Sequence, residues 1–340
     1  MFNNYFQRVD LFGVKTRKTE LLTKKKKILF IGGSLNQTTM MHQIANHLSE
    51  FDVYFTPYYA DGIELFALKI GILENTVLGG RFRKRTEGYI KEHGLQLDYA
   101  GKNNDYDLVV TSSDLIIQKN IKDKKIVLVQ EGMTDPQNWW YYLVKYLHLP
   151  RYSASTSMTG LSNKYDVFCV ASEGYKEFFI KSGCDADRIV VTGIPNFDNC
   201  AQYLNNDFPY KDYVLVCTSD MRETLKYENR KKFIKDALKI ADGRQLIFKL
   251  HPNEYHDRSK SEINKLAPDV LVFESGNTEH MIANCDTLIV IYSSVAYVGL
   301  ALGKKVYSRY NVDKLKKMIP IQNGGTSAKK IADICKRYLE

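Results

Sequence analysis

The chain has 340 residues, about twice the length of a typical single domain, which favours two domains. Apolar residues make up 44% and charged residues 26%, a balance that excludes a disordered chain, a collagen and a coiled coil. Lys and Arg (48) outnumber Asp and Glu (39), a formal charge of +9. This surplus favours an anionic partner, without choosing among nucleic acid, an anionic membrane surface and phosphorylated or acidic small molecules.

The six cysteines show neither a Cys-x-x-Cys pair nor a cysteine-histidine spacing, so we expect reduced thiols and no structural zinc. The first ten residues lack the basic start and apolar run of a secretory signal. No stretch approaches the roughly 20 apolar residues that a membrane-spanning helix needs. We therefore predict a cytoplasmic protein, and contact with a membrane surface stays open.

Short apolar runs alternate with amphipathic segments from Lys27 onward. The first run breaks at Gly32-Gly33-Ser34, where a helix is expected to start, and residues 61–104 are predicted to be helical and basic. The predicted strands of this half are 28–31, 53–55, 107–110, 126–129, 167–170 and 189–191.

After Pro195, residues 196–212 are rich in Asn, Asp and Tyr and indicate a linker, beyond which the pattern restarts. The second half is predicted to contain strands 213–216, 245–248, 270–273, 287–290 and 305–307, helices 224–241, 278–284 and 294–302, and a last helix, 327–339. Near-continuous Val, Ile and Leu runs are typical of parallel strands covered on both faces. The sequence therefore predicts an α/β protein with two doubly wound Rossmann-like domains facing a central cleft, residues 1–205 and 206–325.

Ligands in open α/β sheets bind at the carboxyl ends of the strands, so polar residues that follow strands are the candidates. Gln130-Glu131-Gly132 follows strand 126–129, and Glu131 is well placed there as a general base. Asp135-Pro136 is predicted to cap a helix that begins at Gln137, whose positive end would keep Glu131 ionised. The alternative is a solvated loop glutamate.

In the second half, Thr218-Ser219-Asp220 follows strand 213–216, with Arg222 nearby to bind an anion. Asp220 either caps the next helix or faces Glu131 across the cleft. Two carboxylates that flank an anomeric carbon serve glycosyl transfer, one as nucleophile and the other as acid/base.

Two further motifs follow strands in the second half. Lys249 and His251 lie at a strand end that Pro252 terminates, and each is either functional or structural. Ser293-Ser294 opens the helix 294–302, where hydroxyls and free backbone N–H groups suit a phosphate as well as an ordinary helix cap.

In this order the motifs resemble those of GT-B glycosyltransferases that use CMP-activated 2-keto sugars, the bacterial sialyltransferases and Kdo transferases. Gln130-Glu131-Gly132 resembles their acidic-acidic-Gly motif, His251-Pro252 their His-Pro motif, and Ser293-Ser294 their hydroxyl pair. Gln130 departs from the pattern, so only Glu131 carries over as the base. The resemblance implies a GT-B fold in which residues 326–340 form a helix that packs back on the first domain.

Within that group the chain resembles the retaining β-Kdo transferases of capsule and lipopolysaccharide assembly, which place an aspartate upstream of the His-Pro motif. The resemblance implies that Asp220 attacks C2 of CMP-β-Kdo and that an acceptor hydroxyl, deprotonated by Glu131, then displaces it with net retention. The residues assigned to the donor are Ser219, Arg222, Lys249, His251, Pro252, Ser293 and Ser294. Those assigned to the acceptor side are Gly33, Ser34 and Gly132.

Several alternatives stay open. One is an inverting sialyl- or nonulosonic-acid transferase with Glu131 as base and Asp220 structural, and another is a polyol-phosphate polymerase using CDP-glycerol. The chain also resembles UDP-GlcNAc 2-epimerases in residues 220–224 and in His251-Pro252-Asn253, although Asp220 stands where they have histidine. The non-enzyme alternative is a nucleotide-sugar-binding subunit of a glycan assembly complex.

The expected partners are the CMP-sugar donor and a glycan or lipid-linked glycan acceptor. The missing G-x-G-x-x-G after Ile31 argues against a nicotinamide cofactor, and the missing Asp-x-Asp pair predicts transfer without a metal or other cofactor. We see no groove-reading helix or stacking platform for nucleic acid.

The aromatic run 139–143 suits a core stripe, an acceptor sugar or a membrane interface. With the basic runs 24–27 and 81–85, it leaves open a peripheral association with the inner face of the cytoplasmic membrane.

Overall fold

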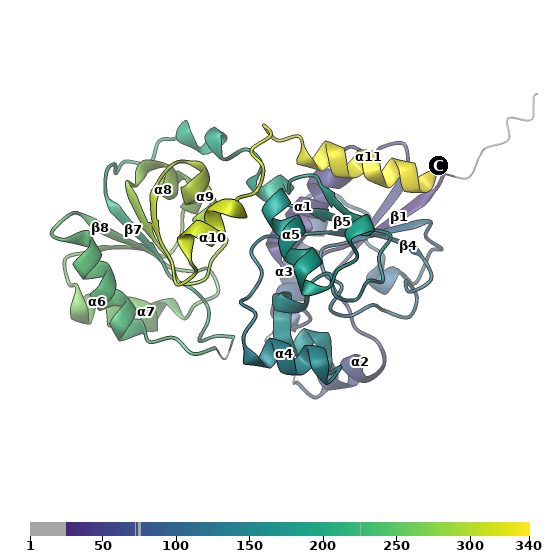
Figure 1. Ribbon diagram of the computed structural model, residues 1–340, viewed down its shortest axis with the longest axis horizontal. Coiled ribbons are helices and arrows are strands. Elements are labelled where there is room, and N and C mark those ends of the chain that lie inside the picture. The colour runs from purple at the N-terminus through teal and green to yellow at the C-terminus, as the bar shows by residue number, and fades with distance from the viewer. Residues whose placement is uncertain (1–24, 72, 74–75, 225) are drawn as a thin grey trace, which may run out of the picture.

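The computed structural model describes residues 25–71, 73, 76–224 and 226–340. The N-terminal segment in which we predicted no secretory signal, and Lys24 of the first basic run, lie outside the described residues. The described chain folds into two parallel-sheet α/β domains with α11 (Ser327–Leu339) lying across the first of them (Figure 1).

The N-terminal sheet has six parallel strands in the order β2-β1-β3-β4-β5-β6. They are β1 (Lys27–Ile31), β2 (Asp52–Thr56), β3 (Leu108–Thr111), β4 (Lys125–Val129), β5 (Val167–Val170) and β6 (Ile189–Val191). The central strands β3, β4 and β5 are almost completely buried, which is why their sequences are continuous apolar runs. All six lie where the sequence predicted strands.

Five α-helices connect these strands: α1 (Leu35–Ala45), α2 (Gly62–Lys69), α3 (Gly80–Glu92), α4 (Trp139–Tyr146) and α5 (Glu173–Ser182). The short 3-10 turns are η1 (Tyr99–Gly101), η2 (Arg151–Met158) and η3 (Ala186–Arg188). The predicted helical region 61–104 is therefore two helices and a turn. The helix predicted to start at Gln137 starts instead at Trp139, where the Asn138 side chain accepts a hydrogen bond from the backbone N–H of Tyr141.

The C-terminal sheet has five parallel strands in the order β11-β10-β7-β8-β9. They are β7 (Val214–Cys217), β8 (Leu246–Lys249), β9 (Leu271–Phe273), β10 (Thr287–Ile289) and β11 (Lys305–Tyr307). Its helices are α6 (Arg230–Ala241), α7 (His256–Leu266), α8 (Thr278–Asn284), α9 (Val295–Ala301) and α10 (Val312–Lys317). The helix predicted from residue 224 begins only at Arg230, after an Asn229 cap. The turns η4 (Pro195–Phe197) and η5 (Cys200–Leu204) lie between the two sheets in sequence.

In each sheet the chain adds strands first on one side of its first strand and then on the other. This switch point lies between β1 and β3 in the first domain and between β7 and β10 in the second. Ligands bind outside the carboxyl ends of strands at such switch points. Gly33 and Ser34 follow β1, Asp220 follows β7, and Ser293 and Ser294 follow β10. The candidate residues therefore surround the positions where this topology favours a ligand.

The helix α11 packs against α1 and β3 of the N-terminal domain. Its side chains Ile331, Ala332 and Cys335 are buried in the same apolar cluster as Ile28 and Met40. All six cysteines are buried and none forms a disulfide. None of the described helices is long and apolar enough to cross a membrane.

Candidate active site

Glu131 is held by the first turn of α1. Ser34 Oγ donates a hydrogen bond to Glu131 Oε1 at 2.8 Å, and Gln37 Nε2 donates to Oε2 at 2.6 Å. Ser34 and Gln37 also form the capping box of α1. A Cβ at Gly33 would lie 1.9 Å from the Gln37 amide oxygen, so the glycine allows the Gln37 side chain to fold back. The helix end that faces Glu131 thus belongs to α1, and our assignment to the helix at α4 was wrong.

Two opposing influences act on the pKa of Glu131, and its ionisation stays a prediction. Burial raises the pKa of Glu131 above the ordinary glutamate value, and the hydrogen bonds from Ser34 and Gln37 lower it only in part. The side chain is nevertheless partly accessible to solvent. A carboxylate with a raised pKa accepts a proton more readily, which suits a general base.

The buried side chain of Gln130, next to Glu131 in sequence, connects two backbone segments by hydrogen bonds. Its Nε2 donates to the Gly132 carbonyl at 2.7 Å, and its Oε1 accepts a hydrogen bond from the Ala171 backbone N–H at 2.9 Å. An ionised acid could not make the first of these bonds. These two hydrogen bonds explain why Gln130, and not an acidic residue, occupies the first position of the motif.

Glu131 lines a cavity of about 360 Å³ at the edge of the N-terminal sheet. Apolar side chains form much of its wall, among them Leu78, Ile116 and Met133. Lys226, from the C-terminal domain, lines the same cavity. The cavity is therefore partly apolar, with one carboxylate and one ammonium group in its wall.

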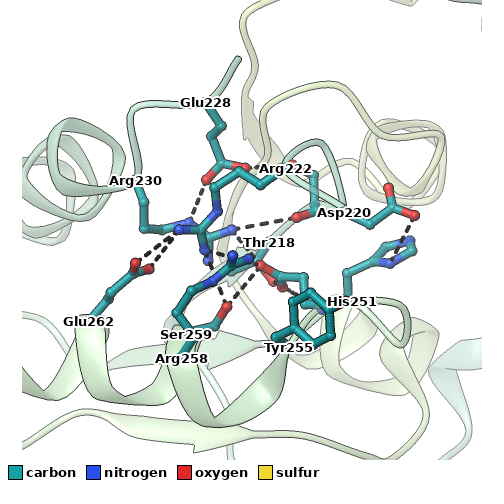
Figure 2. Close-up of polar contacts among 12 residues, drawn as sticks. Thr218, Asp220, Arg222, Glu228, Arg230, His251, Tyr255, Arg258, Ser259 and Glu262 are labelled. Atoms are coloured by element: carbon teal, nitrogen blue, oxygen red, sulfur yellow. Dashed lines mark hydrogen bonds and ion pairs between the residues drawn. The ribbon is translucent and has the colours of Figure 1, made fainter. Parts of the chain in front are cut away.

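Asp220 and His251 lie together at the carboxyl ends of β7 and β8 (Figure 2). His251 Nδ1 is 3.7 Å from Asp220 Oδ2, and Asn253 Nδ2 donates to the same oxygen at 3.0 Å. The backbone N–H of Asn253 donates to His251 Nδ1 at 3.2 Å, which assigns the proton of a neutral imidazole to Nε2. Burial lowers the pKa of His251, and the attraction of Asp220 offsets this only in part, so the ring is neutral at pH 7.

A buried ionic cluster that the sequence did not predict supports the His251 loop. Glu254 Oε2 accepts hydrogen bonds from the His251 backbone N–H at 3.0 Å and from the Thr218 hydroxyl. Glu254 Oε1 pairs with Arg230, which also binds Glu228. Glu254 comes two residues after the exposed Pro252, and that proximity was the one signal available.

Three residues assigned to the donor have their polar groups occupied inside the C-terminal domain. Arg222 Nη1 binds both oxygens of Glu262, at 2.9 and 3.0 Å, and Ser219 Oγ donates to Glu228 at 3.0 Å. Lys249 Nζ donates to two backbone carbonyls at 2.8 and 3.4 Å, and burial lowers its pKa. These contacts hold the framework of the site, and the assignment of the three side chains to the donor stays a prediction.

Ser293 and Ser294 are placed differently, because neither hydroxyl bonds to another residue in the described part of the chain. Ser294 precedes α9 without capping it through its side chain. A Cβ built on Gly132 would lie 3.5 Å from Ser294 Cβ, so the Glu131–Gly132 loop lies against the start of α9 in the other domain. Arg85 Nη1 of α3 adds a second bridge, donating to Asn253 Oδ1 at 2.6 Å.

Among the described residues, no three His, Cys, Asp or Glu side chains are arranged to hold a metal ion. Transfer without a metal stays a prediction.

No family model matches the chain, and no curated protein matches it. Several solved structures do match the chain. A putative UDP-N-acetylglucosamine 2-epimerase from Listeria monocytogenes aligns with a TM-score of 0.55 and 13% identity over 93% of this chain and 97% of its own. The UDP-GlcNAc 2-epimerase of Methanocaldococcus jannaschii, solved with UDP-GlcNAc and UDP, aligns with a TM-score of 0.55 and 14% identity over 92% and 99% of the two chains.

Anabaena Alr3699/HepE in complex with UDP aligns with a TM-score of 0.52 and 11% identity over 92% of this chain and 99% of its own. The alignments extend over both domains, and their low identity makes them evidence of fold. With the two switch points described above, they show that the chain has the two-domain GT-B fold.

Proposed function

We propose that the chain is a glycosyltransferase that moves Kdo from CMP-Kdo to a glycan acceptor with retention of configuration. The observation that carries the proposal is the pair of Asp220 and His251 beside the switch point of the C-terminal sheet, opposite the Glu131 loop. That arrangement supplies one carboxylate from each domain, as two-step glycosyl transfer requires.

Asp220 has the surroundings that a nucleophile needs. Its Oδ2 is held by Asn253, whereas its Oδ1 accepts no hydrogen bond from a described side chain or backbone group. In the first step Oδ1 attacks C2 of the sugar, and the bond from C2 to the phosphate oxygen breaks as CMP leaves. His251 would donate its Nε2 proton in a hydrogen bond to the phosphate, and the two free serine hydroxyls would add further donors.

Glu131 would act in the second step. It takes the proton of an acceptor hydroxyl held in the 360 Å³ cavity, and the oxygen attacks C2 and releases Asp220. Two inversions at C2 give net retention. The raised pKa of Glu131 supports this role, because an ionised group of higher pKa is the stronger base.

The test is intact-mass analysis after incubation with CMP-Kdo and no acceptor. We expect a sugar adduct on the wild type and on Glu131→Ala, and none on Asp220→Ala. Asp269→Asn, an exposed acid of the same domain, is the matched control and should keep the adduct. An adduct on Asp220→Ala would remove the nucleophile role.

A second candidate is an inverting sialyl- or nonulosonic-acid transferase. The observation that favours it is the pair of hydrogen bonds that Ser34 and Gln37 donate to Glu131, because a single base held in this way would suffice for one-step transfer. Product anomeric configuration by NMR separates the two, since one displacement inverts C2. Thermal stabilisation by CDP-glycerol or UDP-GlcNAc, but not by CMP, would overturn the donor class for both.

A further inference from the structure

Asn253 connects the two domains at the candidate active site. Its Oδ1 accepts a hydrogen bond from Arg85 Nη1 of α3 at 2.6 Å, and its Nδ2 donates to Asp220 Oδ2 at 3.0 Å. Its backbone N–H donates to His251 Nδ1 at 3.2 Å. One residue of the loop after β8 therefore contacts the proposed nucleophile, the neighbouring imidazole and a cation from the domain that carries Glu131.

The two side-chain contacts of Asn253 require the same orientation of its amide. The guanidinium of Arg85 only donates hydrogen bonds and needs the amide oxygen, whereas the ionised carboxylate of Asp220 only accepts them and needs the amide nitrogen. A reversed amide would place its oxygen against the carboxylate and its nitrogen against the cation. Arg85 therefore fixes which end of Asn253 faces Asp220, and Asn253 in turn fixes which carboxylate oxygen is held.

Arg85 differs from its neighbour Arg83 in the group that it binds. Arg83 pairs with Glu87 of the same helix at 2.6 Å, whereas no carboxylate among the described residues pairs with Arg85. The Arg85 side chain is exposed, and substitutions at such positions usually leave stability nearly unchanged. We therefore expect Arg85→Ala to keep the melting temperature of the wild type, so that an effect on the active site can be measured in a folded protein.

We propose that Arg85 is a positioning residue, which orients Asp220 for attack through the amide of Asn253. The inference rests on the proposed function, in which Asp220 is the nucleophile. Without this amide, Asp220 Oδ2 loses a hydrogen-bond donor, and His251 Nδ1 lies within reach at 3.7 Å. The two side chains face each other (Figure 2), so Asp220 would pair with a protonated imidazole in place of attacking the sugar.

The titration of His251 therefore reports on the contact between Arg85 and Asn253. Burial lowers the pKa of His251, and charged groups around the ring act on it too. These are Asp220, Glu254 and Glu223, which raise the pKa, and Lys249, which lowers it. We expect Arg85→Ala to raise the pKa of His251 above its wild-type value, measured by NMR of the imidazole. Asn253→Ala should raise it too, although it removes no charge.

The second measurement is the rate of adduct formation at Asp220 with saturating CMP-Kdo. We expect Arg85→Ala to lower this rate about 10²-fold, the loss that a small misplacement of a reacting group can cause, with the affinity for CMP unchanged. Arg85→Lys should recover part of the rate, since an ammonium group can still donate to Asn253 Oδ1. Adding Asn253→Ala to Arg85→Ala should cause no further loss, because both act through one contact.

Two variants serve as controls. Lys84→Ala removes an exposed cation of the same helix and should change neither the His251 titration nor the adduct rate. Tyr310→Phe removes another hydrogen bond between the domains, which Tyr310 Oη donates to the Thr134 carbonyl at 2.7 Å. It should leave the His251 titration unchanged.

Two results would overturn the proposal. One is a His251 pKa that is the same in Arg85→Ala and in the wild type. The other is losses of adduct rate that add up in the double variant, because Arg85 would then act independently of Asn253. The proposed function fails separately: absence of a wild-type adduct removes Asp220 as the nucleophile, whereas the His251 titration tests the Arg85 contact without any donor.

Discussion

At Glu131, burial and hydrogen bonding act on one carboxylate in opposite directions. Burial favours the protonated form, and the Ser34 and Gln37 donors favour the ionised form. Because the pKa is raised on folding, the folded protein binds this proton at a higher pH than the unfolded chain does. The ionised carboxylate therefore lowers stability at neutral pH, which is a cost typical of a catalytic group.

We expect Glu131→Gln to reduce transfer about 10²- to 10⁴-fold at pH 7 without lowering the melting temperature. The amide removes the base and also removes the buried charge. Activity assays and thermal unfolding at pH 7 check both parts. Glu254→Gln is the contrast, since it removes half of a buried ion pair with Arg230 and should lower the melting temperature. Equal losses of stability in the two variants would contradict the account of Glu131.

His251 predicts a dependence of stability on pH. Its pKa is lowered on folding, so the unfolded chain takes up a proton near the ordinary value of 6.5 while the folded site resists it. Stability contributed by neutral His251 is therefore present above pH 6.5 and lost as pH falls below it. We expect His251→Gln to make the fall in urea midpoint between pH 7 and pH 5 less steep.

The control for this prediction is His47→Gln, an exposed histidine in the N-terminal domain. It should leave the slope of the urea midpoint against pH unchanged. A slope that is the same in His251→Gln and the wild type would show that the imidazole is not held neutral by its surroundings.

At the scale of elements, the start of α4 shows how a long-range contact overrides a local signal. Asp135-Pro136 is a good capping sequence, yet the Asp135 carboxylate pairs with Lys226 of the other domain at 3.0 Å. The helix begins at Trp139, two residues after the predicted Gln137, with Asn138 as its cap. Asp135 thus contributes to the contact between the domains, while Asn138 caps the helix.

Gly174 of α5 lies in close contact with the end of α10, in the other domain. A Cβ built there would lie 2.0 Å from the carbonyl oxygen of Lys317 at the end of α10. We expect Gly174→Ala to destabilise the protein by about 1–3 kcal/mol, because the backbones must separate. Gly88→Ala, in an exposed position of α3 with no atom within 4 Å of the new Cβ, should instead stabilise by about 1 kcal/mol. Urea denaturation of both variants measures the difference, and a common sign would contradict it.

At the scale of the whole molecule, the last helix of the chain completes the core of the first domain. Ile331 of α11 is fully buried against the N-terminal sheet cluster. We expect Ile331→Ala to cost about 2–5 kcal/mol in the free energy of unfolding. Its neighbour Lys330, an exposed residue, gives the control Lys330→Ala, which should stay within about 0.5 kcal/mol of the wild type. Similar stabilities in urea for the two variants would show that α11 is dispensable for this core.

The two parallel sheets could be predicted from the sequence alone. Strands buried on both faces are apolar at nearly every position. Runs such as 126–129 and 167–170 can therefore be predicted as strands without knowing which strands pair with them. The same alternation located the residues that follow strands, among them Glu131, Asp220 and His251. Their type and order carried the resemblance to GT-B glycosyltransferases, and the fold it implied is confirmed.

Only the tertiary structure decided what each polar group binds. Glu131 meets Ser34, 97 residues away, and Arg222 meets Glu262, 40 residues away. Such pairs leave no local pattern, because hydrogen bonds and ion pairs depend on distance in space and not on spacing along the chain. The same limit hid the role of Glu254, since burial is a property of the packed molecule.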